Sequence, residues 1–371
     1  MRLRMLTVFL GLFALSFAGL FASSSSADLQ SGRPDLQSAG ALAFSPQGIL
    51  FVGDNAGAAV FAIDVQDRDK PESSEPVQVR QIDQKMAALL GTSADQIRIQ
   101  DMKVHPVSQK VYFSVTRGRG QEAQPVLLRL NQDKIEEVSL SNVPFAKASI
   151  DNAPAADAKD RRGRPLRRET ITQLAYLDGW VYLAGLSNEE FASQLRRIPF
   201  PFTGKAQNSS LEIYHVAHGR YETHAPVRAF LPFTLGGQPH IVASYTCTPL
   251  VSFPISDLKD GQHVKGKTVA ELGAGNSPLD MISYQSEGKT YLLLANSSRN
   301  MMKIDPEEIV KAQSLSEPLN ERYGTRGVPY TSIPGSGILQ VDNLNDANVL
   351  ILQRNSQDGS LNLSSRPNRR F

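Results

Sequence analysis

Short apolar stretches separated by polar turns repeat along most of the chain. Segments such as ILFVG, VYFSV, YLLLAN and VLILQ are nearly continuous runs of strand-forming residues, and the turn sequences SPQG, YLDG, LGGQ and SEGK lie beside runs of this kind. Runs that are too short for helices and bounded by turn residues indicate strands packed on both faces. The pattern predicts an all-β protein.

One phrase recurs along the sequence: an apolar stretch, a turn, a second apolar strand, a polar turn and a third strand. Between second strands the steps range from 50 residues (Ile241 to Tyr291) to 70 residues (Val111 to Val181). A period of this size fits propeller blades of four strands with inserted loops. We predict a six-bladed β-propeller, with a seventh, degenerate blade inside an insertion as the alternative. The six copies begin at Ala41, Asp101, Thr172, Val227, Leu279 and Gly337.

The insertions between copies differ in kind. Residues 81–98 and 305–324 have the apolar spacing of short helices, with an Asp or Pro near the start of each. Residues 152–169 are polar and contain six Lys or Arg between Lys159 and Arg168. A run of this kind is typical of an exposed, solvated loop; an anionic partner or a proteolytic cleavage site is the alternative.

The N-terminus has the order of a secretory signal peptide. Arg2 and Arg4 precede an apolar run from Leu6 to Ala22, and a serine-rich segment follows. We predict a signal peptide over residues 1–27 and a single propeller domain over residues 28–371, in a secreted or periplasmic protein. An uncleaved anchor is the alternative, because the run approaches the length that spans a bilayer. No membrane span is expected in the mature chain.

Net charge gives no reason to expect a polyanionic partner. The chain has 39 basic and 37 acidic residues, and loss of Arg2 and Arg4 with the signal peptide leaves 37 of each sign. Affinity for nucleic acid or for an anionic membrane depends on an excess of positive charge. We therefore expect a small molecule or a protein as partner, and no nucleic acid.

Polar residues recur at the starts of the predicted inner strands and in the turns that share their face of the ring. These positions meet at the mouth of the central channel, where carboxylates bind a hard cation such as calcium and arginines bind carboxylate or phosphate groups. The alternative is that each Asp or Asn bonds only its own backbone or the neighbouring blade and has no ligand. The predicted ligand-binding residues are Asp54, Asn55, Asp101, Arg117, Gln173, Arg228, Asp280, Asn296 and Arg299.

Two segments resemble known propellers. GALAFSPQGILFVGDN, from Gly40, resembles the blade phrase of six-bladed propellers of the gluconolactonase and strictosidine-synthase kind and of NHL-type repeats. NSPLDMISYQSEGKTYLLLANSS, from Asn276, is similar to the segment in which the lactonases place an acid before an inner strand. The resemblance implies Asp280 as a metal ligand. Asp101 stands in the same Asp-Met dipeptide, whereas SAGALAF, at the first inner strand, lacks the glutamate that those lactonases place there.

The only cysteine, Cys247, follows four histidines within 32 residues. His215 and His218 are three apart, and His224 precedes the fourth predicted inner strand, so His224 and Cys247 form an alternative metal set for zinc or copper. His240 is expected at the opposite end of the blade. No CxxC or CxxCH motif is present, which excludes covalent c-type haem attachment. A buried, inert cysteine is the competing interpretation.

The sequence leaves open whether the protein is an enzyme. A complete repeat scaffold without a complete catalytic motif favours a propeller that binds a ligand or partner at the channel mouth without turnover. The first alternative is a metal-dependent hydrolase of the lactonase kind, with calcium or another divalent metal at Asp101 and Asp280. A redox protein with a quinone or haem cofactor, or a thiol enzyme using Cys247, His224 and Glu222, are further alternatives.

Overall fold

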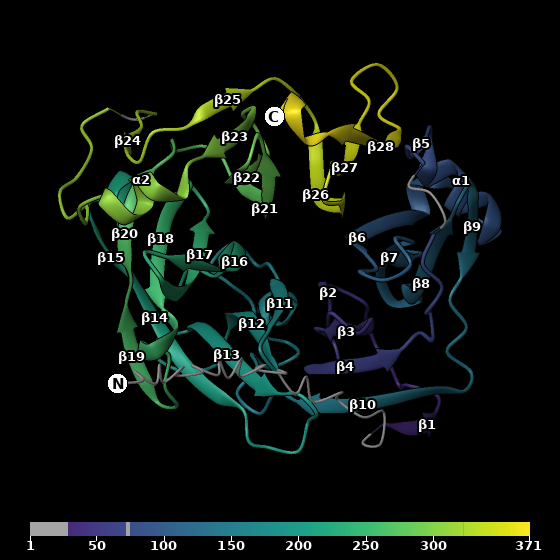
Figure 1. Cartoon of the computed structure of the whole chain (residues 1–371). Coiled ribbons are helices and arrows are strands. Elements are labelled where there is room, and N and C mark those ends of the chain that lie inside the picture. The colour runs from purple at the N-terminus through teal and green to yellow at the C-terminus, as the bar shows by residue number, and fades with distance from the viewer. Residues whose placement is uncertain (1–28, 72–74, 322) are drawn as a thin grey trace, which may run out of the picture.

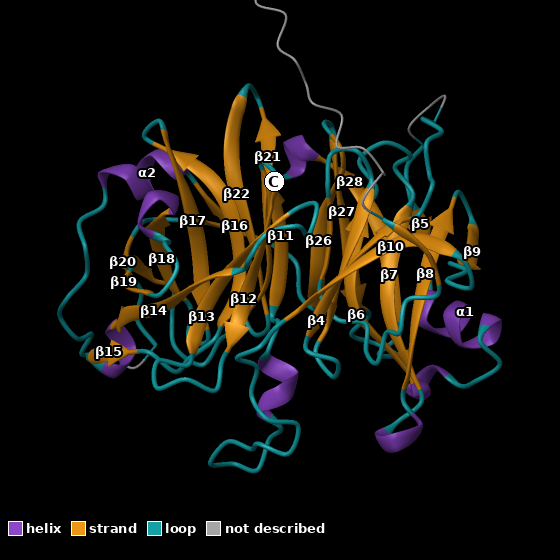
Figure 2. Ribbon diagram, turned by 90° about the horizontal axis from the view of Figure 1, so that it is seen from below, coloured by secondary structure: helices purple, strands orange, loops and turns teal. Residues whose placement is uncertain are grey.

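The chain forms a ring of six β-sheets. The computed structural model describes residues 29–71, 75–321 and 323–371. Figure 1, viewed along the axis of the ring, shows six sheets arranged radially, and Figure 2 shows their strands running roughly parallel to that axis. The predicted six-bladed β-propeller is confirmed. The predicted division into a signal peptide and a domain over residues 28–371 stays a prediction, because residues 1–28 lie outside the described part.

The sheets are numbered as blades 1 to 6 in the chain order of their innermost strands. Blade 1 consists of β2 (Leu42–Phe44), β3 (Ile49–Asp54), β4 (Ala59–Asp64), β10 (Val143–Ser149) and β1 (Gln30–Gly32). Blade 2 consists of β6 (Ile97–Val104), β7 (Val111–Arg117), β8 (Gln124–Asn131) and β9 (Lys134–Glu137). Blade 3 consists of β11 (Gln173–Leu177), β12 (Trp180–Leu186), β13 (Ser193–Pro199), β14 (Gln207–His215), β15 (Arg220–Glu222) and β19 (Gln262–Lys265).

The remaining blades follow the same antiparallel plan. Blade 4 consists of β16 (Val227–Leu235), β17 (Gln238–Tyr245), β18 (Pro249–Pro254), β20 (Lys267–Glu271) and β24 (Arg326–Gly327). Blade 5 consists of β21 (Pro278–Ser286), β22 (Lys289–Asn296), β23 (Met301–Ile304) and β25 (Thr331–Ile333). Blade 6 consists of β26 (Ile338–Asn345), β27 (Asn348–Arg354), β28 (Leu361–Pro367) and β5 (Gln78–Val79).

The blades do not follow one another around the ring in chain order. Contacts between innermost strands run β2, β6, β26, β21, β16, β11 and back to β2, so blade 1 lies between blades 2 and 3. After β4 the chain supplies β5 as the outer strand of blade 6, forms blade 2, and returns as β10 to complete blade 1. The first part of the chain therefore supplies strands to blades 1, 2 and 6, and these exchanges close the ring.

The core lies between neighbouring blades. All six residues of β3 and all six of β4 are buried, as expected for strands covered on both faces. Phe51 of blade 1 and Leu183 of blade 3 belong to one apolar cluster, and Val115 of blade 2 shares another with Leu352 of blade 6. The near-continuous apolar runs of the sequence thus fill the interfaces between blades.

The insertions contain little regular structure. The two described α-helices, α1 (Ile82–Leu89) and α2 (Pro306–Lys311), are shorter than the predicted segments 81–98 and 305–324. Short 3₁₀ helices are η2 (Ala94–Gln96), η3 (Gly120–Glu122), η4 (Leu166–Glu169), η5 (Val216–His218), η6 (Ile255–Asp257) and η7 (Asn368–Arg370). Among the described helices, none is long and apolar enough to cross a membrane.

Candidate functional site

Four innermost strands carry a β-bulge near the face of the ring where they begin, called the mouth face below. The register shifts lie between Ile99 and Asp101 in β6, and at equivalent places in β16, β21 and β26. A bulge leaves one residue without a cross-strand partner and turns its side chain out of the ladder. The extra residues are Gln100, Arg228, Leu279 and Leu339.

The bulges frame a polar cavity at the centre of the mouth face, called the mouth cavity. Its volume is about 230 Å³, and all six innermost strands or the residues just before them contribute to its lining. The lining consists of Gly40, Ala41, Asn55, Gln100, Asp101, Arg168, Glu169, Ile171, Thr172, Gln173, Arg228, Leu279, Asp280 and Gln340. No aromatic side chain of the described residues lines it, so recognition there depends on charge and hydrogen bonding.

Several polar residues of the mouth cavity tie neighbouring blades together. Asp101 of β6 accepts a hydrogen bond from the Leu42 N–H of β2 at 2.7 Å, and Gln173 of β11 accepts one from Phe230 of β16. The amide of Asn55 spans from blade 1 to Ile171, to which it both donates and accepts. These bonds satisfy backbone groups at strand starts, where the sheet ladder cannot.

A lysine lies below the carboxylates on the channel axis. Lys103 Nζ is 3.6 Å from Asp280 Oδ2 and 3.9 Å from Asp101 Oδ1. Burial, opposed by Lys103, raises the pKa of Asp101 to about 6, and burial also raises the pKa of Asp342. Although burial acts against it, attraction to Asp280, Asp101 and Asp342 raises the pKa of Lys103 well above its ordinary value.

This arrangement bears on the predicted calcium site. Asp101 and Asp280 lie together, as the sequence predicts, but the ammonium of Lys103 already supplies a cation between them. Asp280 also accepts hydrogen bonds from Met281 N–H at 2.9 Å and from Val341 N–H at 3.2 Å. The geometry favours an internal ammonium over a divalent ion, and metal binding by this pair stays a prediction.

Five of the nine predicted ligand-binding residues line the mouth cavity: Asn55, Asp101, Gln173, Arg228 and Asp280. Arg228 Nη1 pairs with Glu169 Oε2 at 2.6 Å, and its Nε donates to Thr246 Oγ1 at 3.3 Å. The guanidinium is therefore fixed at the cavity wall by the η4 segment. It keeps donors for a ligand, since a guanidinium has five.

The other four predicted residues lie outside the mouth cavity. Asp54 is buried and accepts hydrogen bonds from the backbone of Gln37, Ser38 and Gly57, so it is a turn cap. The remaining three are Asn296, which accepts from Asn276 at 2.9 Å, Arg299, which donates to Tyr323 O at 3.1 Å, and Arg117, which ends β7 without lining this cavity.

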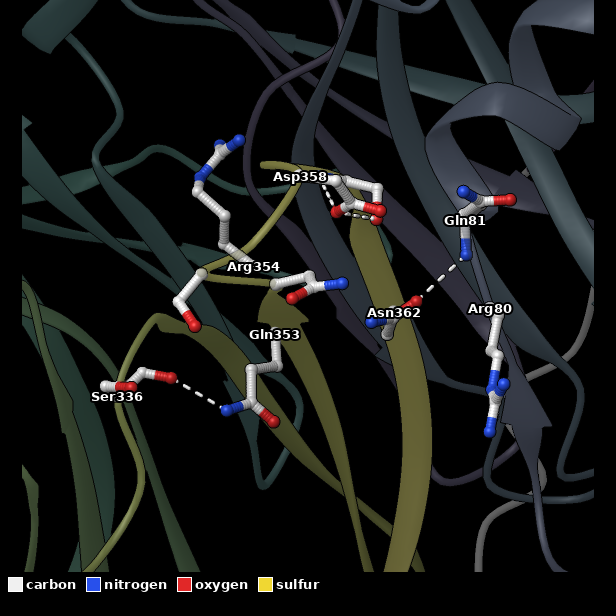
Figure 3. A pocket seen from close by; sticks show the side chains of 10 residues that line it. Arg80, Gln81, Ser336, Gln353, Arg354, Asp358 and Asn362 are labelled. Atoms are coloured by element: carbon white, nitrogen blue, oxygen red, sulfur yellow. Dashed lines mark hydrogen bonds between the residues drawn. The ribbon is translucent and has the colours of Figure 1, made fainter.

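Two further cavities continue the mouth cavity outward between blades 2 and 6. The middle cavity, of about 480 Å³, shares Gln100, Leu279 and Gln340 with it. The rim cavity, of about 510 Å³, shares Arg354 with the middle one. Figure 3 shows the rim cavity, with Arg354 and Asp358 on one side and Arg80 and Gln81 on the other. We call the three cavities together the mouth groove.

Several arginine side chains of the mouth groove lack hydrogen-bond or ion-pair partners among the described residues, whereas the acidic side chains have such partners. The guanidinium groups of Arg80, Arg98 and Arg168 make no hydrogen bond or ion pair with any described residue, and all three residues are exposed. By contrast, Asp83 accepts from Leu361 N–H at 3.0 Å, and Asp358 accepts from the Ser360 N–H and hydroxyl at 2.9 and 2.6 Å. Asp83 binds the start of β28 and Asp358 binds its own turn, whereas three guanidinium groups are available.

The histidines and the cysteine separate into two groups. His215, His218 and Cys247 come together between blades 3 and 4, at the ends of β14 and β17. His224 is exposed, bonded to Thr223 Oγ1, and is not part of the cluster. The structure thus groups Cys247 with His215 and His218, and metal binding by His224 and Cys247 stays a prediction. His240 lies near the start of β17, at the opposite end of the blade from Cys247, as predicted.

Sequence reasoning missed several residues of the mouth. Lys103 and Asp342 are absent from the predicted set, although Lys103 stands two positions after Asp101 and so faces the same side of its strand. The two-residue period of side chains along a strand could therefore have identified Lys103. Arg168 was assigned to a solvated loop, with an anionic partner or a cleavage site as alternatives, and nothing in the sequence shows that η4 returns to the mouth cavity.

The fold and the groove define this protein as a six-bladed β-propeller with a polar site on its mouth face. No protein-family model and no curated protein matches the sequence. Solved structures do match at low similarity. The extracellular region of plexin A4, domains 1 to 8, is 7% identical with a TM-score of 0.39 over 91% of this chain and 47% of that one. The present chain thus spans less than half of that plexin chain.

Two enzymes are similar to a comparable degree. The PQQ-bound aldose sugar dehydrogenase of Streptomyces coelicolor is 11% identical with a TM-score of 0.32, over 91% of this chain and 96% of that one. A Trypanosoma rangeli sialidase in complex with 2,3-difluorosialic acid is 11% identical with a TM-score of 0.38, over 89% and 54%. Similarity this remote concerns the fold alone, and it carries no argument about activity.

Proposed function

We propose that this protein is an exported binding propeller whose mouth groove holds an elongated anionic ligand without turning it over. The observation that carries the proposal is that three arginines of the groove lack partners whereas its acids have them. The guanidinium groups of Arg80, Arg98 and Arg168 have no partner among the described residues. Asp83 and Asp358, by contrast, accept backbone hydrogen bonds, and Glu169 pairs with Arg228. Guanidinium groups recognise carboxylates and phosphates through paired hydrogen bonds.

The shape of the groove supports a ligand longer than a monosaccharide. The three cavities follow one another from the channel axis to the outer edge of blade 6, and the arginines are distributed along them. Arg168 and Arg228 are at the inner end, Arg98 is in the middle, and Arg80 is at the rim. A ligand with several acidic groups would contact all three cavities.

Absence of turnover is proposed because the acids at the inner end serve the scaffold. Both carboxylate oxygens of Asp101 accept backbone hydrogen bonds, from Leu42 and from Met102. A general acid or base needs access to the reacting group of its substrate. Export from the cytoplasm is proposed from the sequence of residues 1–27, which the structure leaves undescribed.

The test uses a fluorescently labelled hexaglutamate peptide as an anionic probe and a hexaglutamine peptide as its neutral counterpart. Binding is measured by fluorescence anisotropy at low and at physiological salt. We expect hexaglutamate to bind and hexaglutamine not to. Arg168→Gln and Arg98→Gln should each weaken binding up to about 5-fold, because an exposed ion pair contributes up to about 1 kcal/mol.

The matched control is Arg161→Gln. Arg161 is an exposed arginine in the same loop as Arg168, and it lines none of the three cavities. Equal binding by Arg161→Gln and weaker binding by the groove variants supports the proposal. Equal loss in all three variants, or equal binding of both peptides, would reject it. Hydrolysis of the bound probe that Asp280→Asn abolishes would establish an enzyme instead.

A further inference from the structure

A cluster of two imidazoles and one thiol lies at the edge of the mouth face, between blades 3 and 4. His215 ends β14, η5 places His218 one turn later, and Cys247 occupies the turn between β17 and β18. One ring nitrogen of each histidine and the Cys247 Sγ all lie within 4.8 Å of one another. The rings are close, with centroids 3.9 Å apart.

A single carboxylate orients both rings. Glu222 Oε2 is 2.7 Å from His215 Nδ1, and Glu222 Oε1 is 2.7 Å from His218 Nδ1. A carboxylate oxygen accepts a hydrogen bond, so each Nδ1 carries the proton that it donates to Glu222. Each Nε2 then carries a lone pair, and a carboxylate behind the ring is the usual support of a metal-bound histidine.

The nitrogen of His215 that faces away from Glu222 has no partner. His215 is 2% exposed, and its Nε2 is buried with no hydrogen bond to any described atom. A buried lone pair without a donor costs free energy, on the order of 1–3 kcal/mol. Such a group inside a His, His and Cys cluster points to a bound species that the protein chain itself does not supply.

The backbone holds the thiol in place in a conformation that cysteine disfavours. Cys247 has φ 65 and Thr248 has φ 60, both in the left-handed region. Hydrogen bonds from Cys247 N–H to Asn276 O at 2.8 Å and from the Thr248 hydroxyl to Gly273 O at 3.0 Å hold this turn. Disfavoured backbone conformations of this kind are common at functional sites.

We propose that His215, His218 and Cys247 bind one ion of the zinc or copper class through two imidazole nitrogens and a thiolate. Binding replaces the S–H bond of Cys247 with a bond from sulfur to the metal and releases the proton to solvent. Ligand atoms around tetrahedral zinc are about 3.5 Å apart, so the cluster contracts by about 1 Å on loading. The side chain of His218 is 43% exposed, which leaves the fourth position of the ion to water or a small ligand.

The experiment uses the reduced, chelator-treated full chain and titrates it with Zn²⁺ and then with Co²⁺. We expect one equivalent of Zn²⁺, a higher melting temperature when it is bound, and a thiolate-to-cobalt charge-transfer band with Co²⁺. Cys247→Gly removes the thiol at a position where glycine is comfortable, and it should abolish the band and weaken Zn²⁺ binding at least about 100-fold. Glu222→Gln should weaken binding about 10–100-fold.

The matched control is His224→Gln, which removes a neighbouring exposed histidine outside the cluster. Its Zn²⁺ affinity should equal that of the unmodified protein, while His218→Asn should lose affinity as Cys247→Gly does. No stoichiometric ion, a cobalt band that survives in Cys247→Gly, or equal loss in His224→Gln would overturn the proposal. The metal content of the protein as purified distinguishes zinc from copper. None of these outcomes depends on the arginines of the mouth groove.

Discussion

The carboxylates around Lys103 on the channel axis and the histidine cluster between blades 3 and 4 differ in how many of their buried polar atoms have hydrogen-bond partners. On the axis, all six carboxylate oxygens of Asp101, Asp280 and Asp342 accept backbone N–H bonds, and Lys103 lies among them. At the edge, His215 Nε2 and Glu271 Oε1 are buried without any partner in the described residues.

The difference separates scaffold chemistry from chemistry that needs a ligand. A buried charge that is paired and fully bonded holds neighbouring elements in register, here the innermost strands of blades 1, 2, 5 and 6. A buried polar atom without a partner costs stability, and a bound ion or water molecule is one way to satisfy it. The chain itself satisfies the carboxylates of the axis cluster, whereas the edge cluster leaves a buried nitrogen of His215 for the metal ion proposed above.

The largest effect is expected from Lys103→Met. Removing the ammonium leaves Asp101, Asp280 and Asp342 facing one another in a buried space, and loss of one partner of a buried ion pair costs about 3–5 kcal/mol. Urea unfolding at neutral pH should show a loss of this size. The loss should shrink at lower pH, where the carboxyls protonate.

The control for that comparison is Lys134→Met. The side chain of Lys134 is 79% exposed in its pair with Glu136, so its removal should cost less than about 1 kcal/mol. Similar losses in the two variants would mean that the axis cluster does not hold the blades together.

A smaller effect is expected from Glu271→Gln, through pH. Burial raises the pKa of Glu271 from 4.5 to about 7. The folded protein therefore keeps a proton that the unfolded chain releases, and stability falls as pH rises from 4.5 through 7. The glutamine variant cannot ionise but keeps an acceptor for the Ala217 N–H, which Glu271 Oε2 accepts at 3.3 Å. Relative to the variant, the unmodified protein should lose about 3 kcal/mol across this window.

Unfolding free energies measured at intervals between pH 4.5 and 8 provide the check. Glu317→Gln serves as the control, because the side chain of Glu317 is 79% exposed. Its stability should follow the unmodified protein at every pH. Parallel curves for Glu271→Gln and the unmodified protein would show that Glu271 is ionised in the folded state.

The blades were predictable from sequence because the three inner strands of each are consecutive in the chain. Strands such as Ile49–Asp54 and Lys289–Asn296 are formed by residues adjacent in the chain, and their apolar runs are covered on both faces. The positions of the innermost strands followed from the repeat. The outer strands β5 and β10 did not, since each joins a blade whose other strands lie elsewhere in the sequence.

The sites were predictable only as far as residue types. Asp101 and Asp280 were correctly expected near each other, because equivalent positions of a repeat converge on the axis. Two features that no single motif reveals decide how these carboxylates are bonded. They are the bulges at the strand starts and the position of Lys103 beside the carboxylates. In the histidine cluster, Glu222 was expected to orient His224. The short β15 hairpin instead turns Glu222 toward His215 and His218.

The smallest effect concerns Cys247 without metal. At φ 65, a side chain with a Cβ is strained by roughly 1–2 kcal/mol, and glycine is not. Cys247→Ala and Cys247→Gly both remove the thiol, but only the glycine variant relieves the strain. We expect the metal-free glycine variant to be more stable than the alanine variant by about 1 kcal/mol, after the greater backbone entropy of glycine is subtracted. Urea unfolding of both variants in chelator measures the difference. Equal stabilities would mean that the turn relaxes once the thiol is removed. The cysteine itself would then cause the left-handed backbone conformation, and this conformation would no longer support a bound ion.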